Sequence, residues 1–279
     1  MLIALIGPTL SGKTTVARYL IQRHAFTPVT AASNLDVNEA VGSLSFRSHA
    51  DLLTHVTSHW RQNFVTEDLR RIEDISLGFD KRPFFLLHVS MSEQRPARSL
   101  SRSLIRVQNS SADLASLYAH LDDLDLVNAA RLRPPWDSYF LSLCTLASLR
   151  SNCMKRRVGA VLVRSNRVLS TGYNGTAIGL LNCNQGGCPR CNGGAQGGTR
   201  LDECLCLHAE ENALLECGRE RGGAEGTVLY CNTCPCLRCA VKIVQVGVKE
   251  VVYELAYSMD DRSREIFRNA GVKFRQCHP

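Results

Sequence analysis

Apolar runs and amphipathic stretches alternate along the first half of the chain, a pattern typical of α/β proteins. The run at 2–6 predicts a short buried strand, the stretch at 15–21 is compatible with a helix, and the run at 84–89 predicts a further strand. The pattern breaks at 131–135, where two adjacent prolines cannot continue a helix and favour an extended linker. We therefore expect a first domain at 1–134.

The second half, 135–279, carries its own strand and helix signals. A helix is predicted at 137–150, where Asp137 can cap it, and two apolar runs joined by Ser165-Asn166 predict a hairpin. Later elements alternate in type, with helices expected at 210–217, from Pro235 to near Gly247 and at 260–270, and strands at 227–230, 250–253 and 272–275. Together they predict a second domain with a mixed sheet and helices on its faces.

Cysteine usage divides the chain at the same place. All 13 cysteines lie at Cys144 or later, and ten of them fall between Cys183 and Cys239. No signal-peptide pattern precedes the first strand, so we expect a reducing compartment in which thiolates bind metal instead of forming disulfides. No apolar run approaches the roughly 18 residues of a membrane span. We expect a cytoplasmic protein, with the nucleus as a second location.

The net charge of +7 falls mostly in the second half, where 18 basic residues stand against 13 acidic ones. This surplus suits anionic substrates. The densest basic group, Lys155-Arg156-Arg157, lacks the interleaved aromatic residues of a single-strand binding track, so we do not expect nucleic acid as a partner. A solvated charged turn is the alternative interpretation of this triplet.

A phosphate-binding loop follows the first strand. Residues 7–14 fit the pattern G-x-x-x-x-G-K-[ST] through Gly7, Gly12, Lys13 and Thr14. In such a loop, backbone N–H groups hold phosphate oxygens, Lys13 reaches the terminal phosphates and the Thr14 hydroxyl can hold Mg²⁺. The sequence therefore predicts that the first domain binds a nucleoside triphosphate, such as ATP, with Mg²⁺.

Phosphoryl transfer by this domain is less well supported than phosphate binding. Ser90 follows the strand at 84–89, where a kinase would more usefully carry an aspartate near Mg²⁺. Four arginines then occur at helical spacing: Arg95, Arg98, Arg102 and Arg106. They resemble the lid of small-molecule kinases, although a solvated helix face explains them equally well. The domain resembles a P-loop nucleoside-monophosphate-kinase-type fold, for which we predict nucleotide binding and leave catalysis open.

Metal-ligand spacing is clearest in the second domain. His208-Ala209-Glu210 and Pro235-Cys236-Leu237-Arg238-Cys239 supply one imidazole, two thiols and one carboxylate. The ligands His208, Cys236 and Cys239 leave a fourth position of a zinc ion open for water, whose pKa the metal lowers towards neutrality. Glu210 would then move protons as general acid and base. A purely structural zinc site is the alternative, but it needs a fourth protein ligand and has no use for that carboxylate.

Both halves of this motif fit the starts of helices. We expect His208 and Glu210 in the first turn of one helix, and Cys236 and Cys239 in another that begins at Pro235. Two helix N-termini at one metal would favour the ionised thiols.

A second zinc site is predicted from cysteines that the first one leaves unused. Cys183, Cys188 and Cys191 lie in a glycine-rich, polar segment, and apolar burial cannot offset its chain entropy. A closed four-cysteine zinc site would order it, with Cys204 preferred to Cys206 as the fourth ligand because Cys206 lies nearer the catalytic centre. We then expect two zinc ions per chain. A flexible loop with free thiols is the alternative.

Six motifs in order resemble the deoxycytidylate deaminase family, part of the zinc-dependent cytidine and deoxycytidylate deaminases. They are Trp136-Asp137, Arg150-Ser151-Asn152-Cys153, Val158-Gly159-Ala160-Val161, Thr171-Gly172-Tyr173-Asn174-Gly175, Leu207-His208-Ala209-Glu210-Glu211-Asn212-Ala213 and Cys234-Pro235-Cys236-Leu237-Arg238-Cys239. The resemblance covers 136–275, and with its phosphate loop the whole chain resembles the two-domain form found in fungi. It implies a P-loop NTPase-like parallel-sheet domain at 1–134 and a cytidine-deaminase-like three-layer α/β/α domain at 135–279.

The resemblance also implies a hydrolase acting on the C–N bond of a cyclic amidine. Its reaction would convert dCMP and water to dUMP and ammonia, and the dUMP would supply thymidylate synthesis. In such a site Glu210 protonates N3 of the cytosine ring and then the departing amino group. The family further implies allosteric activation by dCTP, inhibition by dTTP and assembly into homo-oligomers.

Substrate contacts are expected around the glycine turn at 172–175. Asn174 matches the family asparagine that holds the sugar, although a simple turn would explain it too. For the monophosphate we expect Ser151, Arg156 and Arg157, because hydroxyl and guanidinium groups can bind phosphate oxygens.

Two other functions share part of these observations. A deaminase of tRNA, single-stranded nucleic acid or another nucleotide would use the same zinc chemistry, but a polynucleotide would need a groove for its flanking nucleotides. A catalytically inactive nucleotide-sensing scaffold would keep the zinc as a structural element and the phosphate loop as the sensor. The presence of Glu210 argues against the scaffold.

Overall fold

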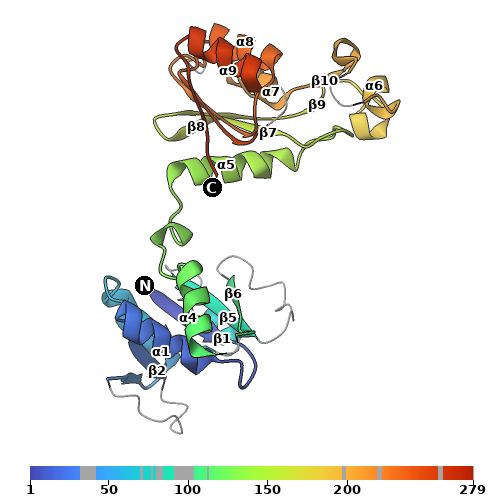
Figure 1. The fold of residues 1–279 in the computed structure, drawn as a ribbon. Coiled ribbons are helices and arrows are strands. Elements are labelled where there is room, and N and C mark those ends of the chain that lie inside the picture. The colour runs from blue at the N-terminus through green and yellow to red at the C-terminus, as the bar shows by residue number, and fades with distance from the viewer. Residues whose placement is uncertain are drawn as a thin grey trace. The chain divides into compact units, whose positions relative to one another are not determined.

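The computed structural model describes residues 1–31, 42–69, 72–76, 78–79, 84–90, 104–111, 113–196, 199–218, 222–256 and 260–278. The chain divides into two compact units, Met1–Arg133 and Pro134–Pro279 (Figure 1). Each unit has its own sheet and its own clusters of buried hydrophobic residues. The division falls within the proline-interrupted stretch at 131–135.

The first unit is built on a parallel six-stranded sheet with the order β3-β2-β4-β1-β5-β6. β1 (Leu2–Ile6) lies inside it, paired with β4 (Phe64–Thr66) on one side and β5 (Phe84–Ser90) on the other. The remaining strands are β2 (Thr27–Ala31), β3 (Leu44–Phe46) and β6 (Leu104–Gln108). Because helices cover both faces of a parallel sheet, β1 is an unbroken apolar run.

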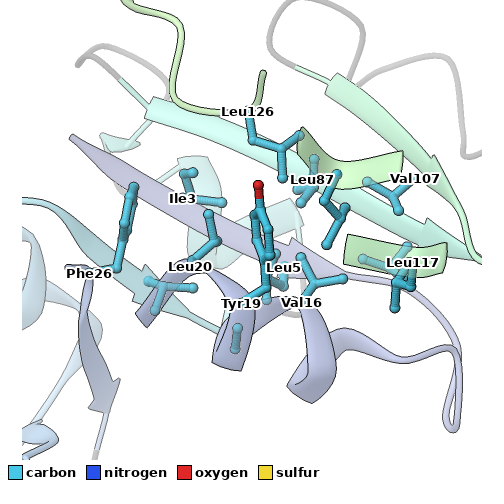
Figure 2. Close-up of a cluster of buried hydrophobic side chains, with 14 residues drawn as sticks. Ile3, Leu5, Val16, Tyr19, Leu20, Phe26, Leu87, Val107, Leu117 and Leu126 are labelled. Atoms are coloured by element: carbon cyan, nitrogen blue, oxygen red, sulfur yellow. The ribbon is translucent and has the colours of Figure 1, made fainter. Parts of the chain in front are cut away.

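Alternate residues of β1 pack against different helices, since successive side chains of a strand point to opposite faces. Ile3 and Leu5 contact α1 (Lys13–His24) and α4 (Leu114–Asp123) in the cluster that Figure 2 shows. Leu2 and Ala4 belong to a second cluster, formed with α2 (His49–Ser58) and α3 (Ile72–Ser76). Packing on both faces of the sheet holds β1 in place and thereby positions the loop that follows it.

The second unit contains a mixed five-stranded sheet with the order β13-β12-β11-β7-β8. β7 pairs antiparallel with β8 and β11, whereas β11, β12 and β13 run parallel to one another. The strands are β7 (Gly159–Arg164), β8 (Arg167–Tyr173), β11 (Val228–Thr233), β12 (Glu250–Leu255) and β13 (Lys273–Gln276). Ser165 and Asn166 have positive φ values of 49° and 59°, as the central residues of a tight hairpin turn require.

Helices lie on both faces of this sheet (Figure 1). α5 (Trp136–Ser148) packs on Val161 and Val163, while α7 (Ala209–Cys217), α8 (Leu237–Gln245) and α9 (Asp260–Asn269) pack on the opposite face with Ala160 and Leu162. Where the structure describes the connection from β8 to α7, its elements are short: β9 (Gly175–Thr176), η4 (Cys183–Gln185), α6 (Pro189–Asn192), η5 (Leu201–Glu203) and β10 (Cys206–Leu207). None of the described helices combines the length and apolar character that crossing a bilayer requires.

Two local predictions need correction. α5 begins at Trp136 with Pro135 as its N-cap, so Asp137 lies inside the first turn; its carboxylate binds Arg275 instead of capping the helix, because a guanidinium offers two charged donors. Arg106 lies on β6, where pairing with β5 overrides the helical spacing. The other three arginines of that series, Arg95, Arg98 and Arg102, lie outside the described residues.

Candidate metal centre and active-site cavity

Two helix starts bring the predicted zinc ligands together. His208 is the N-cap residue of α7, Cys236 is the N-cap residue of α8, and Cys239 lies in the first turn of α8. The Nδ1 atom of His208 lies 3.4 Å from the Sγ atom of each cysteine. A tetrahedral zinc ion, with Zn–N and Zn–S bonds of about 2.0 and 2.3 Å, separates such ligands by roughly 3.5 Å. The donor set therefore fits zinc.

The helix boundaries differ slightly from the predicted ones. His208 and Cys236 precede the first helical residue instead of lying in the first turn, and Pro235 lies one residue before the cap of α8. Both cap residues have extended backbone angles, which direct their side chains across the helix starts. The positive ends of two helix dipoles consequently meet at the ligand atoms.

The two thiols are hydrogen-bond partners, and this contact shifts their pKa values in opposite directions. A hydrogen bond from Cys239 lowers the pKa of Cys236 to about 3, and the same bond, followed by burial, raises the pKa of Cys239. The hydrogen bond to Cys236 also raises the pKa of His208 to about 9. Because zinc binds thiolates and neutral imidazole, a metal ion would displace these protons.

Glu210 is a buried carboxyl group beside this donor set. Only 3% of the residue is exposed, and burial raises its pKa to about 7. It lies in the first turn of α7, which approaches β8 closely: a Cβ atom at Gly172 would come within 2.0 Å of the Ala209 carbonyl oxygen. Glycine at this position therefore lets α7 pack against the sheet and holds Glu210 at the metal centre.

A cavity of about 420 Å³ opens beside the metal centre, and its lining includes His208, Glu210, Cys236 and Asn174. Most of its lining residues come from the connection between β8 and α7 and from the loop before β7. Side chains from several separated segments thus enclose a space large enough for a small ligand.

Asn174 is held rigidly in the wall of this cavity. Its Oδ1 atom accepts hydrogen bonds from Ser151 Oγ at 2.7 Å and from the Val158 backbone N–H at 2.8 Å. Its Nδ2 atom donates to the Arg156 carbonyl oxygen at 2.8 Å. An amide nitrogen carries two N–H groups, and the second one has no partner among the described residues, which leaves it for a ligand.

The residues predicted to bind phosphate occupy different places. The hydroxyl of Ser151 donates to Asn174, so it orients that side chain. Both Arg156 and Arg157 are exposed, but only Arg156 is among the residues that line the cavity. Lys155 also lines the cavity, although the sequence singled it out only as part of a basic triplet. Only the tertiary structure decides which cations of the triplet face the cavity.

Six cysteines gather beside the same cavity. They form two groups of four sulfur atoms that share two members: Cys153, Cys183, Cys191 and Cys206 in one, and Cys188, Cys191, Cys204 and Cys206 in the other. The predicted set of Cys183, Cys188, Cys191 and Cys204 is divided between these groups. The prediction had to choose between Cys204 and Cys206, whereas the structure includes both and adds Cys153, which precedes Cys183 by 30 positions.

The predicted phosphate loop connects β1 to α1. Gly7 and Gly12 have φ values of 145° and 96°, and a Cβ atom at Gly7 would come within 2.0 Å of the Val89 carbonyl oxygen. The Lys13 ammonium donates to the carbonyl oxygens of Gly7 at 3.0 Å and Pro8 at 2.6 Å. A cavity of about 610 Å³ lies at this loop, lined by Lys13 and Thr14 among others.

Glu67 lies next to the loop and was missed by the sequence analysis. It directly follows β4, lines the same cavity and accepts a hydrogen bond from Thr14 Oγ1 at 3.2 Å. From the sequence we considered only the end of β5, where Ser90 lies. Because β4 also pairs with β1, a residue at the end of β4 can reach the loop as well. The acidic pair Glu67-Asp68 after a short apolar run was the available signal, and the strand order was needed to interpret it.

Comparison with known proteins identifies the family. Residues 134–255 match the cytidine and deoxycytidylate deaminase zinc-binding region. Deoxycytidylate deaminase of Schizosaccharomyces pombe is 42% identical to this chain over 315 aligned residues, which cover 99% of this chain and 97% of that protein. The chain belongs to the deoxycytidylate deaminase family. Because the match covers nearly the whole chain, it includes the phosphate-loop unit as well as the metal centre.

Two further matches cover about half of this chain. Deoxycytidylate deaminase of Saccharomyces cerevisiae is 60% identical over 156 residues, 56% of this chain and 49% of that protein. Among solved structures, the dCMP deaminase of cyanophage S-TIM5 in complex with dCMP and dUMP is 30% identical, covers 52% of this chain and 98% of that chain, and has a TM-score of 0.44. The resemblance inferred from six short motifs is confirmed by the 42% identity to the Schizosaccharomyces pombe protein, which extends over 99% of this chain.

Proposed function

We propose that this protein deaminates dCMP hydrolytically, with dUMP and ammonia as the products. The observation that carries the proposal is the buried carboxyl group of Glu210 beside a three-ligand donor set, in a chain that belongs to the deoxycytidylate deaminase family. A structural zinc site would not require that carboxyl group. The same family supports a cytidine-deaminase-like three-layer fold for 135–279.

His208, Cys236 and Cys239 would hold the catalytic zinc ion and leave one tetrahedral position without a protein ligand. When bound, zinc supplies a nucleophile near neutral pH by lowering the pKa of water. Glu210 would take one proton of the attacking water and deliver it to N3 of the cytosine ring, and would then take the second proton of that water and deliver it to the departing amino group. Burial of Glu210 keeps bulk water from competing for these protons.

Substrate recognition is assigned to the remaining polar groups of the cavity. Asn174 presents its second amide N–H to the sugar, and Ser151 fixes the orientation of that amide. Lys155 and Arg156 supply the positive charge for the monophosphate, since both line the cavity and lie beside Asn174 in the fold. Arg157 has no part in this assignment.

We further propose that the first unit, 1–134, is a P-loop NTPase-like domain that binds a nucleoside triphosphate with Mg²⁺. The loop follows the carboxyl end of β1, which lies between β4 and β5 in the sheet. Ligands of open α/β sheets bind in the crevice outside the carboxyl ends of the strands. Gly7 and Gly12 allow the backbone to approach phosphates, Lys13 supplies a cation, and Thr14 with Glu67 supplies oxygen ligands for Mg²⁺. No phosphoryl transfer is assigned to it.

The activity is tested by following ammonia release from dCMP, CMP, deoxycytidine and single-stranded DNA with the purified full chain. We expect dCMP to be turned over far faster than the other three substrates. Faster turnover of single-stranded DNA would favour the polynucleotide deaminase instead. No ammonia from any substrate, with zinc present in the protein, would contradict the proposal.

A further inference from the structure

We propose that the six clustered cysteines form a second metal centre that holds two zinc ions through shared sulfur atoms. Cys153 and Cys183 would bind one ion, Cys188 and Cys204 would bind the other, and the thiolates of Cys191 and Cys206 would bridge both. With the catalytic ion, the protein would carry three zinc ions per chain. This inference is independent of the deaminase activity.

The arrangement follows from how the sulfur atoms are grouped. In each group of four, all sulfur atoms lie within 4.8 Å of one another, so each group can surround one ion. The groups have Cys191 and Cys206 in common. Two tetrahedra that share two corners share an edge, and a metal ion in each would make both shared sulfurs bridging ligands. Six cysteines thus complete two shells of four sulfur atoms each. A single mononuclear site would use only four of the six cysteines.

The sulfur–sulfur distances distinguish metal binding from disulfides. They are 4.0 Å for Cys153–Cys191, 3.9 Å for Cys188–Cys204 and 3.8 Å for Cys191–Cys204. A disulfide requires about 2.05 Å. A zinc ion with four Zn–S bonds of about 2.3 Å places its ligands roughly 3.8 Å apart, which the observed distances match.

The surrounding segment has little else to order it. The buried hydrophobic cluster at this place consists of Cys183, Cys188, Cys191 and Cys206, and its partly buried neighbours are Cys153 and Cys204. In the described residues between 175 and 207, the elements of secondary structure are two to four residues long. Short elements without an aliphatic or aromatic core cannot offset the chain entropy of folding, whereas metal–thiolate bonds can.

A buried cation also indicates negative charge at the cluster. Arg190 is 5% exposed, and one guanidinium nitrogen donates to Cys191 Sγ at 3.9 Å. Its other partners are the carbonyl oxygens of Thr199 and Gln196, and none of the described carboxylates pairs with it. Six thiolates outweigh two divalent ions, so the proposed centre would be anionic and would supply the counter-charge that a buried guanidinium needs.

Further N–H donors point at the sulfur atoms. The Met154 backbone N–H donates to Cys183 Sγ at 3.4 Å, and the Asn192 side-chain amide lies 3.9 Å from the same atom. Hydrogen bonds of this kind stabilise metal thiolates and orient them.

The cluster connects two walls of the active-site cavity. Cys206 lies two residues before His208, and Cys153 lies two residues before Lys155. Four of the six cysteines, Cys153, Cys191, Cys204 and Cys206, line the cavity themselves. The bridged pair would therefore fix the loop that carries Lys155 against the strand that leads into the catalytic histidine.

The first test counts metal ions by native mass spectrometry and elemental analysis of the full chain purified without chelator. We expect three zinc ions per chain, and two in Cys239→Ser, which removes a catalytic ligand only. Cys277→Ser, a cysteine of the same unit outside the cluster, is the matched control and should keep three. A count of two or one in the unsubstituted protein, or iron in place of zinc, would overturn the binuclear centre.

The second test detects the shared sulfurs directly and needs no substitution in the cluster. In protein loaded with ¹¹³Cd, NMR should show two tetrathiolate resonances that split each other, because two metal nuclei joined through common sulfur atoms are scalar-coupled. A third resonance, without that coupling, should arise from the catalytic ligands and should disappear in Cys239→Ser. Tetrathiolate resonances without mutual splitting would contradict bridging by Cys191 and Cys206.

Discussion

The phosphate loop and the catalytic metal centre are assembled in opposite ways. Residues 7–14 are contiguous, and their use depends on backbone conformation between β1 and α1. The metal centre instead takes side chains from His208, Cys236 and Cys239, which only the packing of α7 and α8 against the sheet brings together. A contiguous motif is easy to find, but the phosphate loop does not determine which reaction, if any, its domain catalyses. The dispersed reactive groups of the metal centre do indicate the type of reaction.

This difference predicts how each site responds to substitution. At the metal centre, one side chain carries one chemical role, so replacing it should remove that role and leave the fold intact. At the phosphate loop, backbone N–H groups share the binding, so a side-chain substitution should weaken binding without affecting deamination.

The largest effect is expected for Glu210→Gln. The amide cannot accept or transfer the protons that deamination requires, so turnover of dCMP should fall by about 10³-fold or more, close to the upper end of general acid–base contributions. Zinc content should stay unchanged, because the three ligands remain. Ammonia release and metal analysis measure the two quantities.

Glu211→Gln is the matched control for this substitution. Glu211 is the next residue of α7 and pairs with Lys242 on α8, so its loss should cost a partly exposed ion pair and little activity. Activity of Glu210→Gln within tenfold of the unsubstituted protein would remove Glu210 from its assigned role.

The second effect concerns the phosphate of the substrate. Lys155→Ala and Arg156→Ala should each raise KM for dCMP by about 10- to 100-fold, the range expected for one charge-assisted hydrogen bond. Turnover of deoxycytidine, which has no phosphate, should not change. Arg157→Ala is the control from the same triplet. If it raised KM as much as the substitutions of Lys155 and Arg156 do, lining the cavity would not be what decides which basic residues bind the phosphate.

The third effect tests the separation of the two sites. Lys13→Ala should weaken binding of a nucleoside triphosphate, measured by calorimetry with Mg²⁺, by about tenfold or more, while turnover at saturating dCMP stays within about twofold. Arg18→Ala, an exposed position on the same helix, should change neither. If Lys13→Ala abolished deamination in a folded protein, the two units would be coupled more tightly than we propose.

The smallest effect concerns the ion pair that joins α5 to β13. Arg275 donates two hydrogen bonds to the Asp137 carboxylate, at 2.7 and 3.0 Å, and these bonds hold the pKa of Asp137 below its ordinary value. Since both side chains are about one-third exposed, Asp137→Asn should lower the free energy of unfolding by only about 1–2 kcal/mol.

The pH dependence of that difference follows from the direction of the pKa shift. A carboxyl group with a lowered pKa in the folded state stabilises the protein above its unfolded pKa and loses this contribution as pH falls through the folded pKa. The difference in free energy of unfolding between the unsubstituted protein and Asp137→Asn should therefore be constant near neutral pH and become smaller in acid. Urea unfolding at several pH values measures it, with Glu265→Gln, an exposed carboxylate of α9, as the control. A gap that widened in acid would be inconsistent with this pairing.

Local signals in the sequence were sufficient for much of the fold and for the catalytic motif. Apolar runs identified β1, β7 and β12. The two halves of the metal motif, His208-Ala209-Glu210 and Cys236-Leu237-Arg238-Cys239, indicated the chemistry, because each half consists of residues close in sequence. Helix starts were less accurate. The caps at His208 and Cys236 depend on where the chain leaves a strand, which periodicity does not record.

The tertiary structure decided which distant groups meet. Glu67 reaches Thr14 because β4, and not only β5, pairs with β1, and no local pattern states a strand order. Cys153 and Cys206 join the sulfur cluster because the loop after α5 folds against β10, across 53 positions of sequence. The spacing of residues along a chain constrains only the contacts between residues that are near in sequence. Contacts between distant segments depend on how the sheet and its helices pack, so they emerged only with the fold.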